Sequence, residues 1–199
     1  MAEPKQVLYY FDPACPWTWR TSLWLREVRK VRPLSLEWSF VSLAVLNSPT
    51  DNMRELGEFW SKAALQTLVL AKRTGGDAAV DKLYMELGQA RHTRGEDLDN
   101  PQTIENALEA AGLERGLLAQ ALADPTTLDD LQQSHDHVTK ELKGIGSPGL
   151  VLKDGKQEGP VWYGPIINAV PEAEAAGQFW DNLLPIIERG DFFELKRNR

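Results

Sequence analysis

The only cysteine of the chain, Cys15, is the side chain with the clearest capacity for chemistry. It lies between an apolar, aromatic-rich segment at 6–11 and an amphipathic segment that starts at Pro16, a residue suited to a first helical turn. Cys15 is therefore expected at a helix N-terminus, where free N–H groups and the helix dipole favour an anion. Such a position predicts a thiol pKa below the ~8.5 of free cysteine and a nucleophilic thiolate.

The alternative for Cys15 is a small buried apolar residue, which is the common state of a free cysteine. We favour the reactive interpretation because strand, cysteine, proline and helix follow in this order. After the helix, apolar and polar residues alternate from Leu34 to Phe40 and predict a second, parallel strand over about 34–43. The stripe on the helix that is expected to end near Lys30 consists of Trp17, Thr21, Trp24, Leu25, Val28 and Val31.

Residues 51–143 are helical in character and predict a large insertion, or lid. The expected helices cover 54–72, ended by Gly75-Gly76, then 77–91, 101–112, 114–123 and 126–143. The chain returns to sheet near Gly146, with a hairpin at Asp154-Gly155 and a final helix over 171–189 that Pro185 kinks or ends. The order β-α-β, insertion, β-β-α predicts an α/β thioredoxin-like fold, formed by 1–50 and 144–199.

Composition limits the function classes. At 199 residues and a net charge of -7, the chain is large enough for one well-formed core and too acidic for a nucleic-acid partner. It has no apolar stretch long enough to cross a membrane, and residues 1–11 lack the apolar core of a signal peptide. A single cysteine cannot form an internal disulfide. We therefore expect a cytoplasmic protein, and a homodimer stays open.

Six segments resemble the DsbA-like, mycothiol-dependent nitroreductase family over nearly the whole chain. They are Phe11-Asp12-Pro13-x-Cys15-Pro16-Trp17-x-Trp19, Val41 to Asn47, Arg91-His92, Gly146-Ser147-Pro148, Tyr163-Gly164-Pro165 and Phe192 to Arg197. The resemblance implies a cytosolic thiol-disulfide oxidoreductase that uses mycothiol and, in some members, reduces nitro compounds. It also implies that Pro148 is a cis-proline facing the cysteine, with the backbone of Ser147 free to align a bound thiol or peptide.

The chain departs from the family pattern at Thr18, where the family usually has a second cysteine. A lone thiol cannot expel its own mixed disulfide, so the cycle must be monothiol. Cys15 would be left as a mixed disulfide or sulfenic acid until mycothiol, another low-molecular-weight thiol or a redoxin resolves it. Two roles stay open for Thr18: its hydroxyl donates to the Cys15 thiolate, or it caps the helical turn.

The other candidate site residues are weaker. Pro16, Trp17 and Trp19 flank the cysteine and could form an apolar wall for a planar ligand, although Trp17 also fits the helix stripe. Asn47 is either a polar group in the cleft or a turn residue. By resemblance His92 reaches the cleft, and its alternative is a surface position at a helix C-terminus. Trp24, Trp38, Trp60 and Trp180 are expected in the core, and His135 and His137 are spaced too poorly to bind a metal, which we do not expect.

Three function classes follow. The leading hypothesis is a monothiol oxidoreductase acting on disulfide, nitro or other electrophilic small molecules. The second is a kappa-type thiol transferase or isomerase, which activates the thiol of a bound cofactor. The third is a binding protein without redox activity, suggested by Thr18. Loss of activity in Cys15→Ser distinguishes the first from the second.

Overall fold

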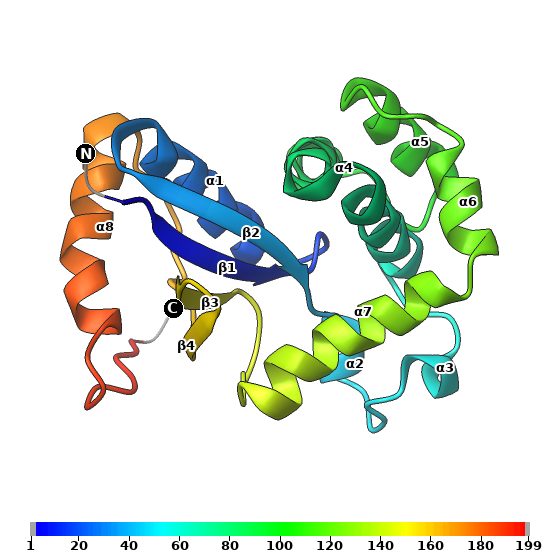
Figure 1. Ribbon diagram of the computed structural model, residues 1–199. Coiled ribbons are helices and arrows are strands. Elements are labelled where there is room, and N and C mark those ends of the chain that lie inside the picture. The colour runs from blue at the N-terminus through cyan, green and yellow to red at the C-terminus, as the bar shows by residue number, and fades with distance from the viewer. Residues whose placement is uncertain (1–2, 198–199) are drawn as a thin grey trace.

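A computed structural model describes residues 3–197 of the protein. Its sheet has the strand order β2-β1-β3-β4, and helices pack on it and beside it (Figure 1). Strand β1 (Lys5–Phe11) is buried from Val7 onward, as its apolar sequence predicts. It pairs in parallel with β2 (Leu34–Phe40), and α1 (Pro16–Val31) connects the two. The predicted βαβ unit is therefore confirmed.

Strand β2 is shorter than the predicted 34–43. The chain leaves the sheet after Phe40, and Ser42 caps the short helix α2 (Leu43–Leu46) by accepting a hydrogen bond from the Val45 N–H. The apolar residues at 43–46 thus belong to a helix, because a serine at the N-cap satisfies a backbone donor that a strand would have left to a neighbour.

The second half of the chain completes the sheet. Strand β3 (Gly149–Asp154) runs antiparallel to β1, and a hairpin leads to β4 (Gln157–Tyr163) at the edge. Helix α8 (Ala173–Ile187) then packs on α1, where the Trp24 indole N–H donates to the Ala176 carbonyl at 3.2 Å. Pro185 lies inside α8 without ending it. The order of elements is the predicted β-α-β, insertion, β-β-α.

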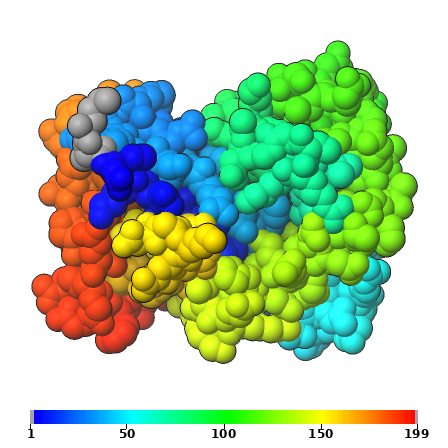
Figure 2. Space-filling view, viewed as in Figure 1, coloured from blue at the N-terminus to red at the C-terminus, as the bar shows by residue number. Residues whose placement is uncertain are grey.

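The insertion forms a second lobe beside the sheet (Figure 2). Its elements are α3 (Met53–Leu56), α4 (Lys62–Gly88), the π-helix η1 (Gln89–Thr93), α5 (Pro101–Ala110), α6 (Leu117–Ala123), α7 (Thr126–Asp136) and the π-helix η2 (His137–Glu141). The helix predicted over 54–72 is interrupted, because Gly57 and Ser61 have positive φ values that a helix cannot contain. Gly76 has a non-helical backbone, with φ 63° and ψ -162°, so α4 consists of two helical segments that meet at a kink, and the predicted helix end at Gly75-Gly76 is confirmed.

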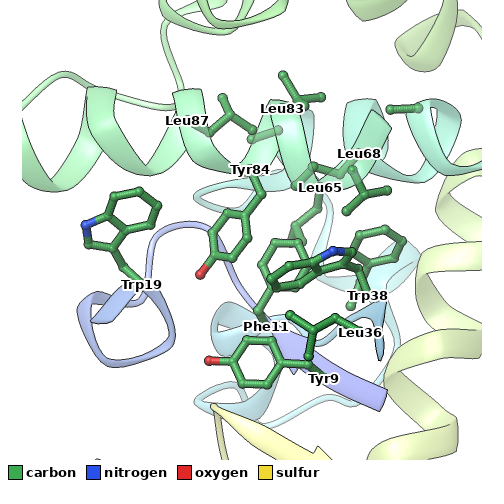
Figure 3. Close-up of a cluster of buried hydrophobic side chains, with 14 of the residues drawn as sticks. Tyr9, Phe11, Trp19, Leu36, Trp38, Leu65, Leu68, Leu83, Tyr84 and Leu87 are labelled. Carbon is green, nitrogen blue, oxygen red and sulfur yellow. The ribbon is translucent and has the colours of Figure 1, made fainter. Parts of the chain in front are cut away.

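One aromatic core joins the two lobes. The ring of Phe11 stacks on that of Tyr84 in α4, with centroids 3.9 Å apart, and Trp38 of β2 contacts both rings edge-on (Figure 3). Arg26 of α1 lies over the Trp38 ring and pairs with Asp81 of α4 at 2.7 Å. The sheet and the insertion therefore bury their apolar surface against each other.

The predicted placement of the tryptophans is correct for all but one of the four assigned to the core. Trp24, Trp38 and Trp180 are buried, whereas Trp60 is 42% exposed. Trp60 precedes the N-terminus of α4 in the interrupted segment, so its side chain is not on a continuous helical stripe. The prediction for Trp60 was wrong for this reason.

Candidate active site

Cys15 lies where the sequence predicts it, at the N-cap of α1 with Pro16 in the first turn. The residue is only 2% exposed. Its Sγ is 4.0 Å from the carbonyl oxygen of Ser147, and the peptide bond between Ser147 and Pro148 is cis. The thiol is therefore enclosed between the first turn of α1 and the loop that leads into β3.

The expected lowering of the thiol pKa is wrong for this enclosed state. Burial raises the pKa of Cys15, because a thiolate loses its hydration there. The backbone N–H groups of Thr18 and Trp17 and the Thr18 hydroxyl act in the opposite direction, but they are outweighed. The helix N-terminus thus supports an anion less strongly than desolvation opposes it. A ligand or an opening that hydrates the sulfur would shift this balance toward the thiolate.

Thr18 is fully buried in the first turn of α1. Its Oγ1 lies 2.8 Å from both the Asp12 and the Cys15 carbonyl oxygens, so the single hydroxyl proton is shared between two backbone acceptors. This geometry favours the turn-capping role over full donation to the sulfur. Thr18 holds the loop closed at the position where the family pattern has a second thiol.

Asp12 is a buried carboxylate that was not among the predicted site residues. It is 0% exposed and accepts hydrogen bonds from the backbone N–H groups of Ala14 and Leu43, both at 2.9 Å, and from the Ser61 hydroxyl at 3.0 Å. Burial raises its pKa to about 6, despite these hydrogen bonds. An Asp-Pro pair after an apolar strand was the available signal, but turns carry the same pair.

His92 of η1 and Trp19 of α1 lie beside the cysteine loop, which is formed by residues 12–15. The His92 Nε2–H donates to the Pro13 carbonyl at 2.9 Å, and burial lowers the pKa of this histidine, which favours the neutral ring. The Trp19 ring stacks on His92 and is 6% exposed. It fills the space left by Gly88, where a Cβ would be 2.2 Å from the ring. Trp19 therefore lies in the core, and His92 binds the loop backbone.

The remaining predicted site residues lie nearer the surface. Pro16 is exposed next to Cys15, and Trp17 is half-buried with the Arg20 guanidinium 5.2 Å from its ring centroid. Asn47 is exposed and donates from Nδ2 to the Leu43 carbonyl at 2.7 Å, which is the geometry of a helix end. Contact of these three side chains with a ligand stays a prediction.

Two structural features bear on metals and membranes. Within residues 3–197, no group of three or more histidine, cysteine or acidic side chains is arranged to hold a metal ion. His135 accepts from the Ser42 N–H, while His137 bonds to the Tyr10 hydroxyl, so the two rings serve different partners. Over the same described range, no helix combines the length and apolar character needed to cross a bilayer.

Comparison with known proteins gives relatives for the sequence and for the fold. The chain is 29% identical over 192 residues to the uncharacterized protein Rv2286c of Mycobacterium tuberculosis, covering 96% of this chain and 81% of the relative. A putative protein disulfide isomerase from Nitrosomonas europaea superposes with a TM-score of 0.64 at 15% identity, covering 92% of this chain and 98% of the other.

The cytosolic disulfide reductase DsbM from Pseudomonas aeruginosa superposes with a TM-score of 0.62 at 14% identity, covering 90% of this chain and 98% of the other. At these identities the two structures establish the fold, which is the DsbA-like thioredoxin fold that the sequence predicts. The profile of the Rv2466c-like family, described as mycothiol-dependent nitroreductase Rv2466c, matches residues 14–197. The chain therefore belongs to the Rv2466c-like family of mycothiol-dependent nitroreductases, a family of oxidoreductase enzymes with this fold.

Proposed function

We propose that the protein is a cytoplasmic thiol-disulfide oxidoreductase that uses Cys15 in a monothiol cycle, with mycothiol or another low-molecular-weight thiol as co-substrate. One observation carries the proposal: the sole cysteine occupies the N-cap position of α1 with its sulfur beside the Ser147–Pro148 loop, and the position three residues on is a buried threonine. The family description supports mycothiol as the thiol. The threonine supports an external thiol as the resolving group, because no second cysteine exists in the chain.

The cycle has two exchange steps. In the first, the Cys15 thiolate attacks the mycothiol sulfur of a mixed disulfide, releases the substrate as a thiolate and becomes a Cys15–mycothiol disulfide. In the second, the thiolate of another mycothiol attacks the mycothiol sulfur of that adduct, which releases mycothiol disulfide and regenerates Cys15. The substrate gains two electrons, and two mycothiol sulfurs become the product disulfide. A redoxin thiol is the second candidate for the resolving step.

The proposed roles of the site residues follow from their positions. The N–H groups of Trp17 and Thr18 favour the leaving Cys15 thiolate in the second step. The backbone of Ser147, ahead of Pro148, would align the bound disulfide alongside the sulfur. Pro16, Trp17 and Asn47 are proposed to contact the mycothiol or the substrate, and His92 and Thr18 hold the loop in place.

Nitro compounds are a proposed further substrate class, because the family is described by that activity. Reduction of a nitro group to a nitroso group consumes two thiols and releases one disulfide and one water. In a monothiol protein, both thiols must come from the co-substrate or one from Cys15. Disulfide exchange requires only that Cys15 supply one attacking thiol, so we expect it to be faster than nitro reduction.

The experiment compares mycothiol-dependent turnover of a mixed-disulfide substrate and of a nitro compound in the native protein, Cys15→Ser and Thr18→Cys. We expect Cys15→Ser to abolish disulfide turnover, and Thr18→Cys to allow turnover through an internal disulfide. Gly116→Ala is the control variant, since a Cβ there has only a distant contact, 3.6 Å from Gln120. Full disulfide turnover by Cys15→Ser would exclude the proposal.

A second candidate function is a kappa-type transferase or isomerase that activates the thiol of a bound cofactor. The observation in its favour is the burial of Cys15, which raises the pKa of this thiol and limits access to it. This function requires saturable binding of reduced mycothiol and retention of activity in Cys15→Ser. The same set of variants therefore separates the two candidates.

A further inference from the structure

The carboxylate of Asp12 connects three segments that are distant in sequence. It precedes Cys15 by three residues, and its Oδ1 accepts the Ala14 N–H of the same loop at 2.9 Å. Its Oδ2 accepts the Leu43 N–H at the start of α2, also at 2.9 Å. The Ser61 hydroxyl, at the N-cap of α4, donates to Oδ1 at 3.0 Å and lies 3.3 Å from Oδ2. The cysteine loop is thus tied through one side chain to the rim of the sheet and to the insertion.

The Ser61 end of this connection is held in an unfavourable backbone conformation. Ser61 has φ 62° and ψ 2°, a left-handed geometry that costs a non-glycine residue on the order of 1 kcal/mol. Its N–H donates to the Asp99 carboxylate at 2.9 Å, and its side chain is 1% exposed. Such conformations persist where the surroundings determine them, and the hydrogen bonds from Ser61 to Asp99 and to Asp12 do so here.

The charged surroundings of Asp12 leave its carboxylate without a compensating cation. Among residues 3–197, no basic side chain forms an ion pair with it. The groups whose charge could act on it are Asp99 beyond Ser61, Cys15 in its own loop and His92 on the Pro13 carbonyl. Lys62 follows Ser61 and begins α4, but its ammonium group donates to the Gly57 carbonyl and to the Glu58 carboxylate instead of to Asp12.

His135 of α7 faces the same region through its contact with the Ser42 N–H, and burial lowers its pKa as it lowers that of His92. Both histidines are therefore expected to be neutral near pH 7. Buried carboxylates without a cation depend on hydrogen bonds to stay ionised. Those hydrogen bonds come from Ala14 in the loop before Cys15, from the start of α2 and from the N-cap of α4.

We propose that Asp12 is a positioning residue for Cys15: its carboxylate holds the cysteine loop against α2 and α4, and its ionisation state acts on the reactivity of the thiol. The proposal rests on the proposed function in one respect, that Cys15 is the nucleophile. An ionised Asp12 places a negative charge near the sulfur and opposes the thiolate, whereas a protonated Asp12 does not. Because burial raises the pKa of Asp12 to about 6, its carboxyl group ionises within the pH range of an alkylation experiment.

The test is the rate of Cys15 alkylation by iodoacetamide, measured by intact mass from pH 4.5 to pH 9, without mycothiol. For an isolated thiol, the logarithm of this rate rises by one for each pH unit below the thiol pKa. In the native protein we expect a shallower rise across the titration of Asp12, near pH 6. Asp12→Asn should restore a slope of one and react about three- to tenfold faster than the native protein above pH 7, because the repelling charge is removed.

Two further variants keep the test decisive. Ser61→Ala removes a hydrogen bond to the charged form of Asp12, so the shallow region should move to higher pH, and this arm decides the question if Asp12→Asn does not fold. Asp77→Asn is the matched control, because Asp77 also accepts a backbone N–H, that of Trp38 at 2.8 Å, away from the cysteine loop. It should leave the profile unchanged.

The outcomes separate the two proposals. Parallel profiles for the native protein and the Asp12 and Ser61 variants, whether superimposed or offset by a constant factor, would overturn the role of Asp12 and leave the proposed function intact. A native Cys15 that is not alkylated at any pH, while the unfolded protein is, would instead remove the nucleophile and with it the proposed function.

Discussion

The burial of the Asp12 carboxylate predicts how the free energy of unfolding depends on pH, and this prediction does not require any activity of the protein. Its pKa rises from 3.8 to about 6 on folding, because burial disfavours the charged form. A folded-state pKa above the unfolded value means that the group contributes stability at low pH that is lost as the pH rises through the folded pKa. A rise of about two pH units corresponds to about 3 kcal/mol. The native protein should lose most of this amount, relative to Asp12→Asn, between pH 4 and pH 7.

The assay is urea unfolding of both proteins at half-unit steps from pH 4 to pH 8, followed by tryptophan fluorescence. The quantity of interest is the free energy of unfolding of the native protein minus that of Asp12→Asn. This difference cancels the other titrating groups, and it should fall with rising pH and level off above about pH 7. A difference that is constant, or that rises with pH, would refute the assignment of a raised pKa to Asp12 and the burial argument behind it.

Two other variants test the packing that joins the insertion to the sheet. Gly88→Ala places a Cβ 2.2 Å from the Trp19 ring, and we expect a loss of about 2 to 3 kcal/mol in the free energy of unfolding, whereas Gly116→Ala should change it little. Arg26→Met removes the guanidinium that lies 2.7 Å from the Asp81 carboxylate and leaves this carboxylate only Arg29, at 3.2 Å, and we expect a loss of about 1 to 2 kcal/mol, measured in the same way. Losses below about 0.5 kcal/mol in either case would contradict the packing described here.

Much of the fold could be predicted from local sequence patterns. The apolar segment of β1, the turn between β3 and β4 and the proline-led start of α5 each carry a short-range signal, and each lies where it was predicted. The order of these elements then predicts the fold, because two parallel strands such as β1 and β2 require a crossover connection, which here is α1.

The errors in the predicted fold lie where the backbone conformation depends on caps, turns and contacts with distant segments that the local sequence pattern does not show. The strand predicted over 34–43 was extended beyond Phe40, where the alternation stops, and in the structure the serine cap of α2 follows the end of the strand. The helix predicted from 54 was broken by backbone turns at Gly57 and Ser61, and Ser61 is a residue type that gives no sign of a positive φ. Trp60 became exposed as a result. A tertiary contact, that of Ser61 with Asp12, stabilises the break.

The site could be predicted only in outline. The sequence placed Cys15 at a helix N-terminus, but its reactivity depends on burial under the Ser147–Pro148 loop, 132 residues away in the chain. The helix N-terminus predicts a lowered pKa, and the desolvation that raises the pKa is a property of the folded structure alone. Asp12 was overlooked for the same reason, because its three hydrogen-bond donors come from separate segments.

The proposed function requires that Cys15 exchanges with a low-molecular-weight thiol in a monothiol cycle. The most direct test is the intact mass of the protein after exposure to mycothiol disulfide, and again after addition of reduced mycothiol. We expect one mycothiol per chain on Cys15 in the native protein, no adduct in Cys15→Ser, and removal of the adduct by the reduced thiol. A folded native protein that forms no adduct, or one whose adduct the reduced thiol cannot release, would contradict it.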